Sequence, residues 1–354
     1  MIKKLGTAIS EYSVRNKLDE DIPVYSVTNE QGFCTGYFSK DVASKDRTTY
    51  KIVPYGYFAY NPSRINVGSI DWQHSEERVI VSPLYVVFGV DESVDKRYLL
   101  HYLKSDIARM LIKNYASGSV RDNLKLSTLM EFPFNFRSLE EQKKIADVLD
   151  KIDNLIGVQK QRMDYFDRLV KSRFIELFGD PLKNDKGLPT VSGEALFKLS
   201  NGKTLPNSKR YTEGIPAYGG NGISWYTDEI LCDYDTIIIG RVGFQSGNVH
   251  LAKAPLWVTD NAMYISSINS KECDIRFLCA LMEHIDFTQY QDAGDLKKIT
   301  QKPFMQMNYL MPPISLQRQY ITFVAQTDKS KLAVQQGLQE LETLKKSLMQ
   351  QYFS

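Results

Sequence analysis

This chain of 354 residues has few cysteines, few histidines and no long apolar run. Its cysteines are too few for a disulfide scaffold and form no C-x-x-C pair (Cys34, Cys232, Cys273 and Cys279). Its histidines have no partner at metal-ligand spacing, so no metal site is expected (His74, His101, His250 and His284). The longest apolar run, residues 79–90, is too short to cross a bilayer, and the N-terminus lacks the apolar core of a signal peptide. We therefore expect a cytoplasmic protein without membrane contact.

The chain also lacks an excess of charge of either sign. Its formal net charge is +2, and its 43% hydrophobic and 24% charged residues are typical of globular domains. Residues 1–137 carry 18 basic and 16 acidic side chains, and residues 179–312 carry 13 and 15. Neither part has the polybasic footprint of many stand-alone nucleic-acid binders. If the chain binds DNA, we expect weak binding alone and reliance on a more basic partner.

The clearest positive signal is a long heptad pattern that begins after Ser138. Ser138 and Glu141 have the spacing of a capping box, and Gly179 followed by Pro181 marks the end of the helix. Apolar residues between them recur at alternating spacings of three and four, as on a coiled-coil seam. The predicted seam residues are Ile145, Leu149, Ile152, Ile156, Met163, Phe166, Val170 and Leu177.

A second, weaker heptad pattern closes the chain. It begins at residues 315–319 and is interrupted by the polar residues Thr327, Lys331 and Lys345. Such a seam associates poorly with itself, so its expected partner is the first helix, and polar seam positions fix the register of such pairs. The chain connectivity makes the pair antiparallel. The predicted apolar seam residues are Val334, Leu338, Leu341 and Leu348.

The segments that precede the two long helices are rich in short aromatic and β-branched runs separated by Gly, Asn, Pro and Ser. Runs at residues 57–60, 79–81 and 237–239 predict strands, whereas residues 97–114 and 275–285 predict helices. The two halves of the sequence match at an offset of 177 residues. Tyr57 corresponds to Tyr234 and Arg64 to Arg241, and further matches at this offset lie near residues 81 and 138. Residues 171–172 match residues 346–347 at an offset of 175. These matches indicate a duplication.

No motif assembles a catalytic site. Residues 202–204 resemble the end of a phosphate-binding loop, but Phe197 stands where the first glycine is required. Residues 141–143 have a nuclease-like Glu-x-Lys spacing, but they lie in a predicted first helical turn, where capping and solvated residues are expected. We therefore expect a non-catalytic protein.

Two loop-rich surfaces carry residues suited to nucleic-acid recognition. Arg reads guanine and Asn or Gln reads adenine through paired hydrogen bonds, and basic side chains contact phosphates. The same Asn, Gly and Ser residues are also common in turns, which is the alternative explanation. The candidate DNA-binding residues are Asn61, Arg64, Asn66, Ser69, Arg121, Tyr218, Asn221, Arg241, Gln245, Ser246, Asn248, Lys297 and Lys298, with Arg64 and Arg241 foremost.

At this point the sequence resembles the DNA-specificity (S) subunits of type I restriction–modification systems. The most specific stretch runs from Leu139-Glu140-Glu141-Gln142 through Leu177-Phe178-Gly179-Asp180-Pro181, and it is echoed at residues 315–319. The resemblance implies an α+β fold with two pseudo-repeated target recognition domains, each followed by a long helix, the helices pairing as an antiparallel coiled coil. The corresponding ranges are residues 1–137, 138–180, 181–312 and 313–354. The recognition domains vary within the family, so no base-contacting residue transfers by motif.

The same resemblance implies a function without catalytic residues in this chain. Each recognition domain is expected to read one half of an asymmetric bipartite site in double-stranded DNA, while two methyltransferase subunits dock on the scaffold and flip adenines. The partners would bring the cofactors: S-adenosylmethionine for methylation, and ATP with Mg²⁺ where translocating restriction subunits join. Two alternatives stay open, namely the specificity subunit of an orphan methyltransferase without restriction and a coiled-coil adaptor with non-DNA ligands.

Overall fold

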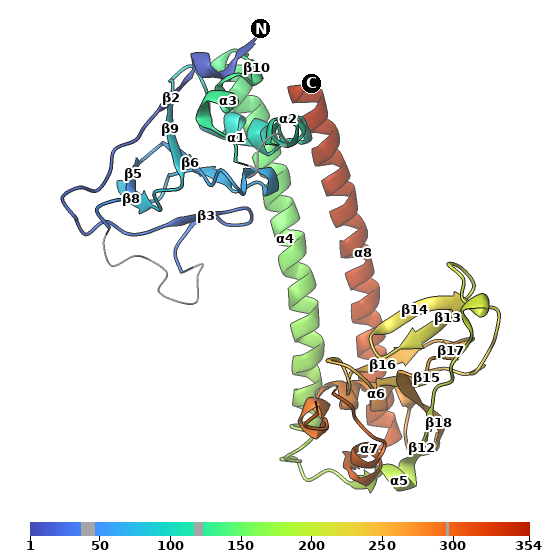
Figure 1. The fold of residues 1–354 in the computed structure, drawn as a ribbon. Helices are drawn as coiled ribbons and strands as arrows, with labels where there is room; N and C mark the ends of the chain where they lie inside the picture. The colour runs from blue at the N-terminus through green and yellow to red at the C-terminus, as the bar shows by residue number, and fades with distance from the viewer. Residues whose placement is uncertain (37–46, 117–122, 295–296) are drawn as a thin grey trace. The chain divides into compact units, whose positions relative to one another are not determined.

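The computed structural model describes residues 1–36, 47–116, 123–294 and 297–354 (Figure 1). The chain forms two compact units, the first comprising Met1–Gln161 with Gln335–Ser354 and the second comprising Arg162–Val334. Two helices of 40 residues, α4 (Leu139–Phe178) and α8 (Ile314–Phe353), each contribute to both units. The four-part division predicted from the sequence therefore stays a prediction, because the compact units divide both long helices.

The first unit is built on a four-stranded antiparallel sheet in the order β2-β9-β6-β7 (Ile9–Glu11, Val86–Val90, Phe58–Tyr60 and Ile70–Trp72). Three two-stranded sheets adjoin it: β1–β10 (Ile2–Lys4 and Pro133–Asn135), β3–β4 (Ser26–Thr28 and Gly32–Cys34) and β5–β8 (Lys51–Pro54 and Arg78–Val81). The helices besides α4 and α8 are α1 (Lys96–Lys104), α2 (Asp106–Ala116) and α3 (Leu126–Met130). Single-turn 3-10 helices lie at Leu5–Thr7 and Ile65–Val67.

The second unit has a sheet of the same kind in the order β12-β18-β15-β16 (Phe197–Asn201, Ala262–Ile268, Thr236–Gly240 and Val249–Ala252). Beside it lie β14-β13-β17 (Gly222–Thr227, Ile215–Gly219 and Trp257–Val258) and the pair β11–β19 (Thr190–Ser192 and Asn308–Leu310). Its short helices are α5 (Gly193–Leu196), α6 (Ile275–Glu283) and α7 (Lys302–Gln306), with 3-10 turns at Asn207–Lys209 and Phe287–Tyr290.

Matching sheet orders confirm the duplication, but its offset is not uniform. Tyr60 pairs with Ile70 as Ile239 pairs with Val249, which is an offset of 179 at β6 and β15. On their other side, Tyr60 pairs with Val86 of β9 and Ile239 pairs with Met263 of β18, and these two partners are 177 residues apart. The alignment of Arg64 with Arg241 at 177 is therefore wrong by two residues. Insertions in loops shift the offset, whereas the ladder hydrogen bonds keep each strand in register.

The predicted strands are confirmed, and one predicted helix is divided. Runs at 57–60, 79–81 and 237–239 form β6, β8 and β15, and residues 237–239 are fully buried in a central strand. The helix expected over 97–114 is instead α1 and α2, which are separated by Ser105 in an extended conformation. Because its Oγ accepts a hydrogen bond from the amide of Ala108, Ser105 caps α2 and ends the continuous helix.

The capping of α4 agrees with the sequence. Glu141 Oε2 accepts hydrogen bonds from the amide and hydroxyl of Ser138, while Ser138 Oγ accepts from the amide of Glu141. These bonds hold the pKa of Glu141 below its usual range. At the other end Gly179 adopts a φ of 72°, a left-handed conformation that suits glycine.

The two long helices pair antiparallel within each unit, along the predicted seams. Ile145, Leu149 and Ile152 are buried, and the remaining predicted seam residues are half-buried (Ile156, Met163, Phe166, Val170, Leu177, Val334, Leu338, Leu341 and Leu348). In the first unit Lys345 pairs with Asp153, and in the second Lys331 pairs with Asp167 at 2.5 Å. The lysines that interrupt the second seam thus meet carboxylates on α4, which fixes the register of the pair.

A buried glutamine attaches each recognition domain to its long helix. Gln142 is 0% exposed, and its amide accepts from the backbone N–H of Asp95 while donating to the carbonyls of Ser93 and Arg137. Gln317, also 0% exposed, makes the corresponding bonds with the N–H of Asp274 and the carbonyls of Glu272 and Pro312. Asp95 and Asp274 cap α1 and α6. Each glutamine therefore joins a domain helix to a long helix through backbone atoms.

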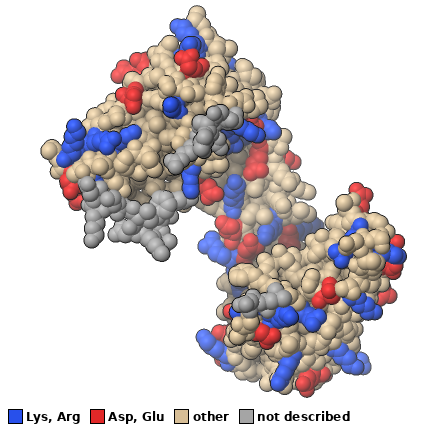
Figure 2. Space-filling view, in the orientation of Figure 1, with Lys and Arg blue, Asp and Glu red and all other residues tan. Residues whose placement is uncertain are grey.

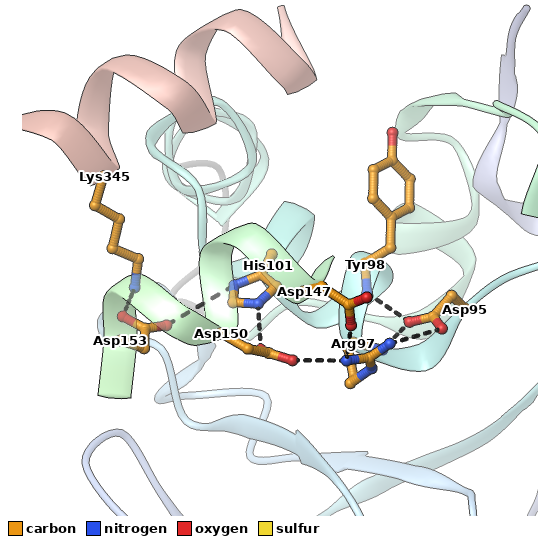
Figure 3. A network of polar contacts seen from close by, with 8 residues as sticks. All are labelled: Asp95, Arg97, Tyr98, His101, Asp147, Asp150, Asp153 and Lys345. Atoms are coloured by element: carbon orange, nitrogen blue, oxygen red, sulfur yellow. Dashed lines mark hydrogen bonds and ion pairs between the residues drawn. The ribbon is translucent and has the colours of Figure 1, made fainter. Parts of the chain in front are cut away.

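The first unit adds an ionic network along α4 (Figure 3). Arg97 of α1 donates to Asp147 at 2.7 Å and to Asp150 at 3.0 Å, and His101 Nε2 lies 2.8 Å from Asp150. Burial opposes the ionisation of Asp150, yet the hydrogen bonds and charges of His101 and Arg97 outweigh it and hold the pKa of Asp150 below its ordinary value.

We predict that Gln142→Leu lowers the free energy of unfolding by about 2–4 kcal/mol, because it leaves one N–H and two carbonyls buried without partners. Urea denaturation of the full chain measures the change. Gln319→Leu, at an exposed position on α8, is the matched control and should stay within about 0.5 kcal/mol of the parent. Equal stabilities for the two variants would show that the buried amide is not an attachment point.

We predict that Asp150→Asn destabilises the chain by about 1 kcal/mol at pH 7, a modest value because the carboxylate is partly exposed. Since the folded-state pKa of Asp150 is depressed, its contribution is present above the unfolded value of about 3.9 and is lost as the pH falls below it. The stability difference should therefore vanish in acid, as urea titrations at several pH values would show. A difference that persists below about pH 3 would contradict the ionic role, and Asp164→Asn, at an exposed position on α4, is the control.

Candidate nucleic-acid interface

Each unit presents one nine-residue loop, and the two loops share a frame that consists of their length, their closing hydrogen bond and a glycine at the eighth position. Inside this frame the first loop contains the 3-10 helix Ile65–Val67, whereas the second forms a turn. The β6–β7 loop is Asn61–Ser69 and the β15–β16 loop is Gly240–Asn248, and in each the amide of the first residue donates to the carbonyl of the last. Gly68 and Gly247 stand at the same place with φ of 90° and 98°. In this frame Arg241 occupies the place of Pro62, and Arg64 that of Gly243.

The β6–β7 loop exposes two of its four predicted contact residues. Arg64 and Asn66 are exposed, and neither side chain has a partner among the residues that the structure describes. Asn61 is half-buried, and its Oδ1 accepts from the amide and hydroxyl of Ser63, which stabilises the turn. Ser69 is 3% exposed and donates to the carbonyl of Val27, so its hydroxyl is structural. Arg121 lies outside the described residues.

Polar side chains from distant segments lie beside the β6–β7 loop. A Cβ at Gly68 would collide with Asn29 Oδ1 and lie 3.6 Å from Arg109 Nη2, which places both side chains next to the loop. The amide of Leu124 donates to the carbonyl of Pro62 at 3.1 Å and so brings the neighbouring exposed Lys125 close. Sequence analysis missed Asn29, Arg109 and Lys125, because only the tertiary fold joins them to Arg64.

The predicted contact residues of the β15–β16 loop are less exposed than those of the β6–β7 loop. Arg241 is half-buried, and its Nη1 donates to the carbonyl of Asp260 at 3.3 Å. Asn248 donates to Gln245 Oε1 at 3.4 Å, which orients both half-buried side chains. Ser246 is 0% exposed, and its Oγ has no hydrogen-bond partner in the described part of the chain. Arg241, Gln245 and Asn248 therefore remain available to a ligand, whereas Ser246 does not.

Two other segments converge on the β15–β16 loop. The amide of Gly243 donates to the carbonyl of Lys297, and the amide of Ile299 donates to that of Arg241, so the exposed Lys297 and Lys298 run alongside. The turn between β13 and β14 packs Gly220 against Gly240, where a Cβ would lie 3.0 Å from the Gly240 Cα. Asn221 is exposed in this turn, whereas Tyr218 is half-buried in β13, where burial raises its pKa.

These groups have the chemistry of DNA readout. The guanidinium and amide groups match the hydrogen-bonding edges of bases, and the lysines beside them suit phosphates. Basic and acidic side chains are interspersed over the face that Figure 2 shows. Within the described ranges, no group of three or more His, Cys, Asp or Glu side chains could hold a metal, and no helix is both long and apolar enough to cross a membrane.

Comparisons with known proteins point in the same direction. Residues 3–164 match the family described as type I restriction modification DNA specificity domain. The chain is 22% identical over 330 residues to the putative type I restriction enzyme MjaX specificity subunit of Methanocaldococcus jannaschii, covering 81% of this chain and 77% of that protein. It is 33% identical over 137 residues to the MjaIX specificity subunit of the same organism, covering 34% of this chain and 32% of that one.

Solved structures share the fold over the full length. The S subunit of a type I restriction–modification system from M. genitalium aligns with 100% of this chain and 96% of its own, at a TM-score of 0.63 and 16% identity. A structure described for complex assembly and conformational transition of the type I R-M system aligns with 99% of this chain and 96% of its own, at a TM-score of 0.62 and 15% identity.

Fold and site together define a duplicated recognition scaffold, in which two sheets present framed polar loops and two long helices carry the sheets. Over residues 3–164 the chain matches the type I restriction modification DNA specificity domain, over most of its length it is similar to type I restriction enzyme specificity subunits, and its function is the recognition of DNA sequence. The family named from the sequence is confirmed, and the alternative of an adaptor for non-DNA ligands is not favoured.

We predict that Arg64→Ala lowers discrimination at one base pair of one half-site by about 1–3 kcal/mol, and that Arg241→Ala does so in the other half-site. Binding assays with a library of single-base variants of the target measure this, with the exposed Arg15→Ala as the control. A uniform loss over all sequences would assign the arginine to a phosphate contact, and no loss would make it a turn residue.

Proposed function

We propose that this chain is the sequence-reading subunit of a DNA methyltransferase complex and that it recognises an asymmetric, interrupted site. The observation that carries the proposal is the pair of nine-residue loops, which have one backbone frame and different side chains. One frame repeated on two sheets suits two separate half-sites. Different side chains, with Arg64 and Asn66 in one loop and Arg241 and Gln245 in the other, suit two different half-site sequences.

Two methyltransferase subunits are the proposed partners on this scaffold. The duplication supports this number, because two units with matching sheets and matching glutamine attachments offer two equivalent surfaces. One structural relative is itself described as part of complex assembly in a type I R-M system. Where the system also restricts DNA, translocating restriction subunits would join the same complex.

The chemistry is proposed to reside in the partners. S-adenosylmethionine would bind the methyltransferase subunits, and ATP with Mg²⁺ would serve a restriction subunit. Adenine N6 would be the methylated atom, reached by flipping the base out of the duplex. This chain would select the site and hold the enzymes on it, in the cytoplasm where the DNA is.

The even charge distribution supports shared DNA binding. With a formal net charge of +2, the chain alone neutralises few phosphates, and counterion release drives much of protein–DNA affinity. The complete complex should therefore bind far more tightly than the isolated chain, and its affinity should decrease steeply with added salt.

We predict that a host carrying this gene with its methyltransferase gene gains N6-methyladenine at one asymmetric, interrupted sequence, and loses it when this gene is deleted. Methylome sequencing measures the outcome. The double variant Arg64→Ala/Arg241→Ala should relax the sequence without lowering the amount of purified complex. An identical methylome with and without the gene would contradict the proposal. Methylation without reduced phage plating would identify a system that modifies but does not restrict.

A further inference from the structure

The most exposed large apolar side chain of the described residues lies on the second recognition loop. Phe244 is 91% exposed at the outer turn of the β15–β16 loop. The residue at the same place in the β6–β7 loop is Ile65, which is 1% exposed and packs in the core of the first unit. Ile65 begins a 3-10 helix, whereas Phe244 lies in a turn with other hydrogen bonds, and this position therefore faces inward in one unit and outward in the other.

The exposure of Phe244 is built into an ordered loop. The amide of Ser246 donates to the carbonyl of Gly243 at 3.0 Å, and that of Gly247 donates to the carbonyl of Gly240 at 2.8 Å. From outside the loop, Gln291 Nε2 donates to the carbonyl of Ser246 at 2.7 Å. These bonds hold the backbone on both sides of Phe244, so the ring projects from a fixed turn.

The core beneath the loop is closed without Phe244. Gly247 packs against Phe287, where a Cβ would lie 3.0 Å from the Phe287 Cβ. Phe287 is 2% exposed and its ring lies 4.4 Å from that of Phe304. The phenyl ring of Phe244 thus contributes nothing to this core, and an apolar surface of that size in water is unfavourable unless a ligand covers it.

The surroundings of Phe244 favour DNA as that ligand. Three basic residues lie on this loop or on the segment hydrogen-bonded to it, namely Arg241, Lys297 and Lys298. Two acidic residues, Asp260 and Asp292, are hydrogen-bonded to the same segments through their backbone, so basic groups are in excess. Gln245 follows Phe244 directly and offers an amide of the kind that reads adenine in the major groove. In the major groove the one apolar feature of a base edge is the C5-methyl group of thymine.

We propose that Phe244 contacts the 5-methyl group of a thymine in the half-site read by the second unit. The proposal rests on the proposed function, since it needs a specific site in DNA. It gives the two recognition domains different chemistries: the second loop offers an aromatic ring to a base, whereas the first loop buries Ile65 at that place and offers no ring there.

The test replaces each thymine of the target by uracil, one at a time, in binding assays with the assembled methyltransferase complex. With the parent chain, one uracil in the second half-site should weaken binding about fourfold, the effect of one buried methyl group. With Phe244→Ala, thymine and uracil should bind equally at that position, and Phe244→Leu should restore part of the difference. Ile230→Ala, which removes another exposed apolar side chain of the second unit, should leave the thymine preference unchanged.

The outcomes separate this inference from the proposed function. Absence of sequence-specific binding by the parent complex would overturn the proposed function itself. Specific binding that is insensitive to every uracil, or an unchanged thymine preference in Phe244→Ala, would overturn the contact alone. Uniformly weaker DNA binding by Phe244→Ala would point to intercalation, and loss of the methyltransferase from the complex would point to a protein contact. Both results would also overturn the methyl contact.

Discussion

The three hydrogen bonds of a buried glutamine amide hold each recognition domain on its helix. Gln142 and Gln317 each satisfy one N–H and two carbonyls at the junction where a capped domain helix meets the start of a long helix. All six partners are backbone atoms, so neighbouring side chains can change without removing a bond. A buried polar group that loses its hydrogen-bond partner destabilises the fold, so a single substitution of the glutamine is unfavourable. The sheets and their loops are positioned within each unit from these junctions.

Around this shared junction the two units use different forces. In the first unit, Arg97 and His101 of α1 reach the carboxylates of α4, so that ionic contacts add to the apolar packing between the two helices (Figure 3). In the second unit, Phe174 of α4 stacks on His284 at 4.0 Å and packs against Tyr320 and Phe277. Added salt should therefore weaken the first attachment more than the second, since salt screens ion pairs and has little effect on contacts between aromatic rings.

Sequence patterns were sufficient for the features that depend on local periodicity. The heptads, the capping box at Ser138 and the terminal Gly179 predicted α4, and the polar interruptions of the second seam predicted the first helix as its partner. The structure adds that Lys331 and Lys345 meet carboxylates there. The duplication was also visible. The match of Arg64 with Arg241 was out of register by two residues, because loop insertions shift the numbering while only strand pairing, which is a tertiary property, shows the true equivalence.

The candidate site was less predictable, because accessibility is not a local property. Serine is common in exposed turns, but the fold buries both Ser69 and Ser246. Asn29 and Arg109 come close to the β6–β7 loop only through the packing around Gly68. Phe244 was not among the candidate residues, and only its 91% exposure in the structure distinguishes it.

The common loop frame has a consequence for how such a protein can change. Both ends of each loop are tied by backbone hydrogen bonds, and glycines with φ near 90° shape the turns, Gly68 in the first loop and Gly243 and Gly247 in the second. None of these ties depends on the side chains at the outer positions, where Arg64 and Asn66 stand in one copy and Phe244 and Gln245 in the other. Replacement of those side chains alters the chemical face of the loop and leaves its path intact. New sequence preferences are thus accessible by single substitutions, each of which starts from a folded, functional ancestor.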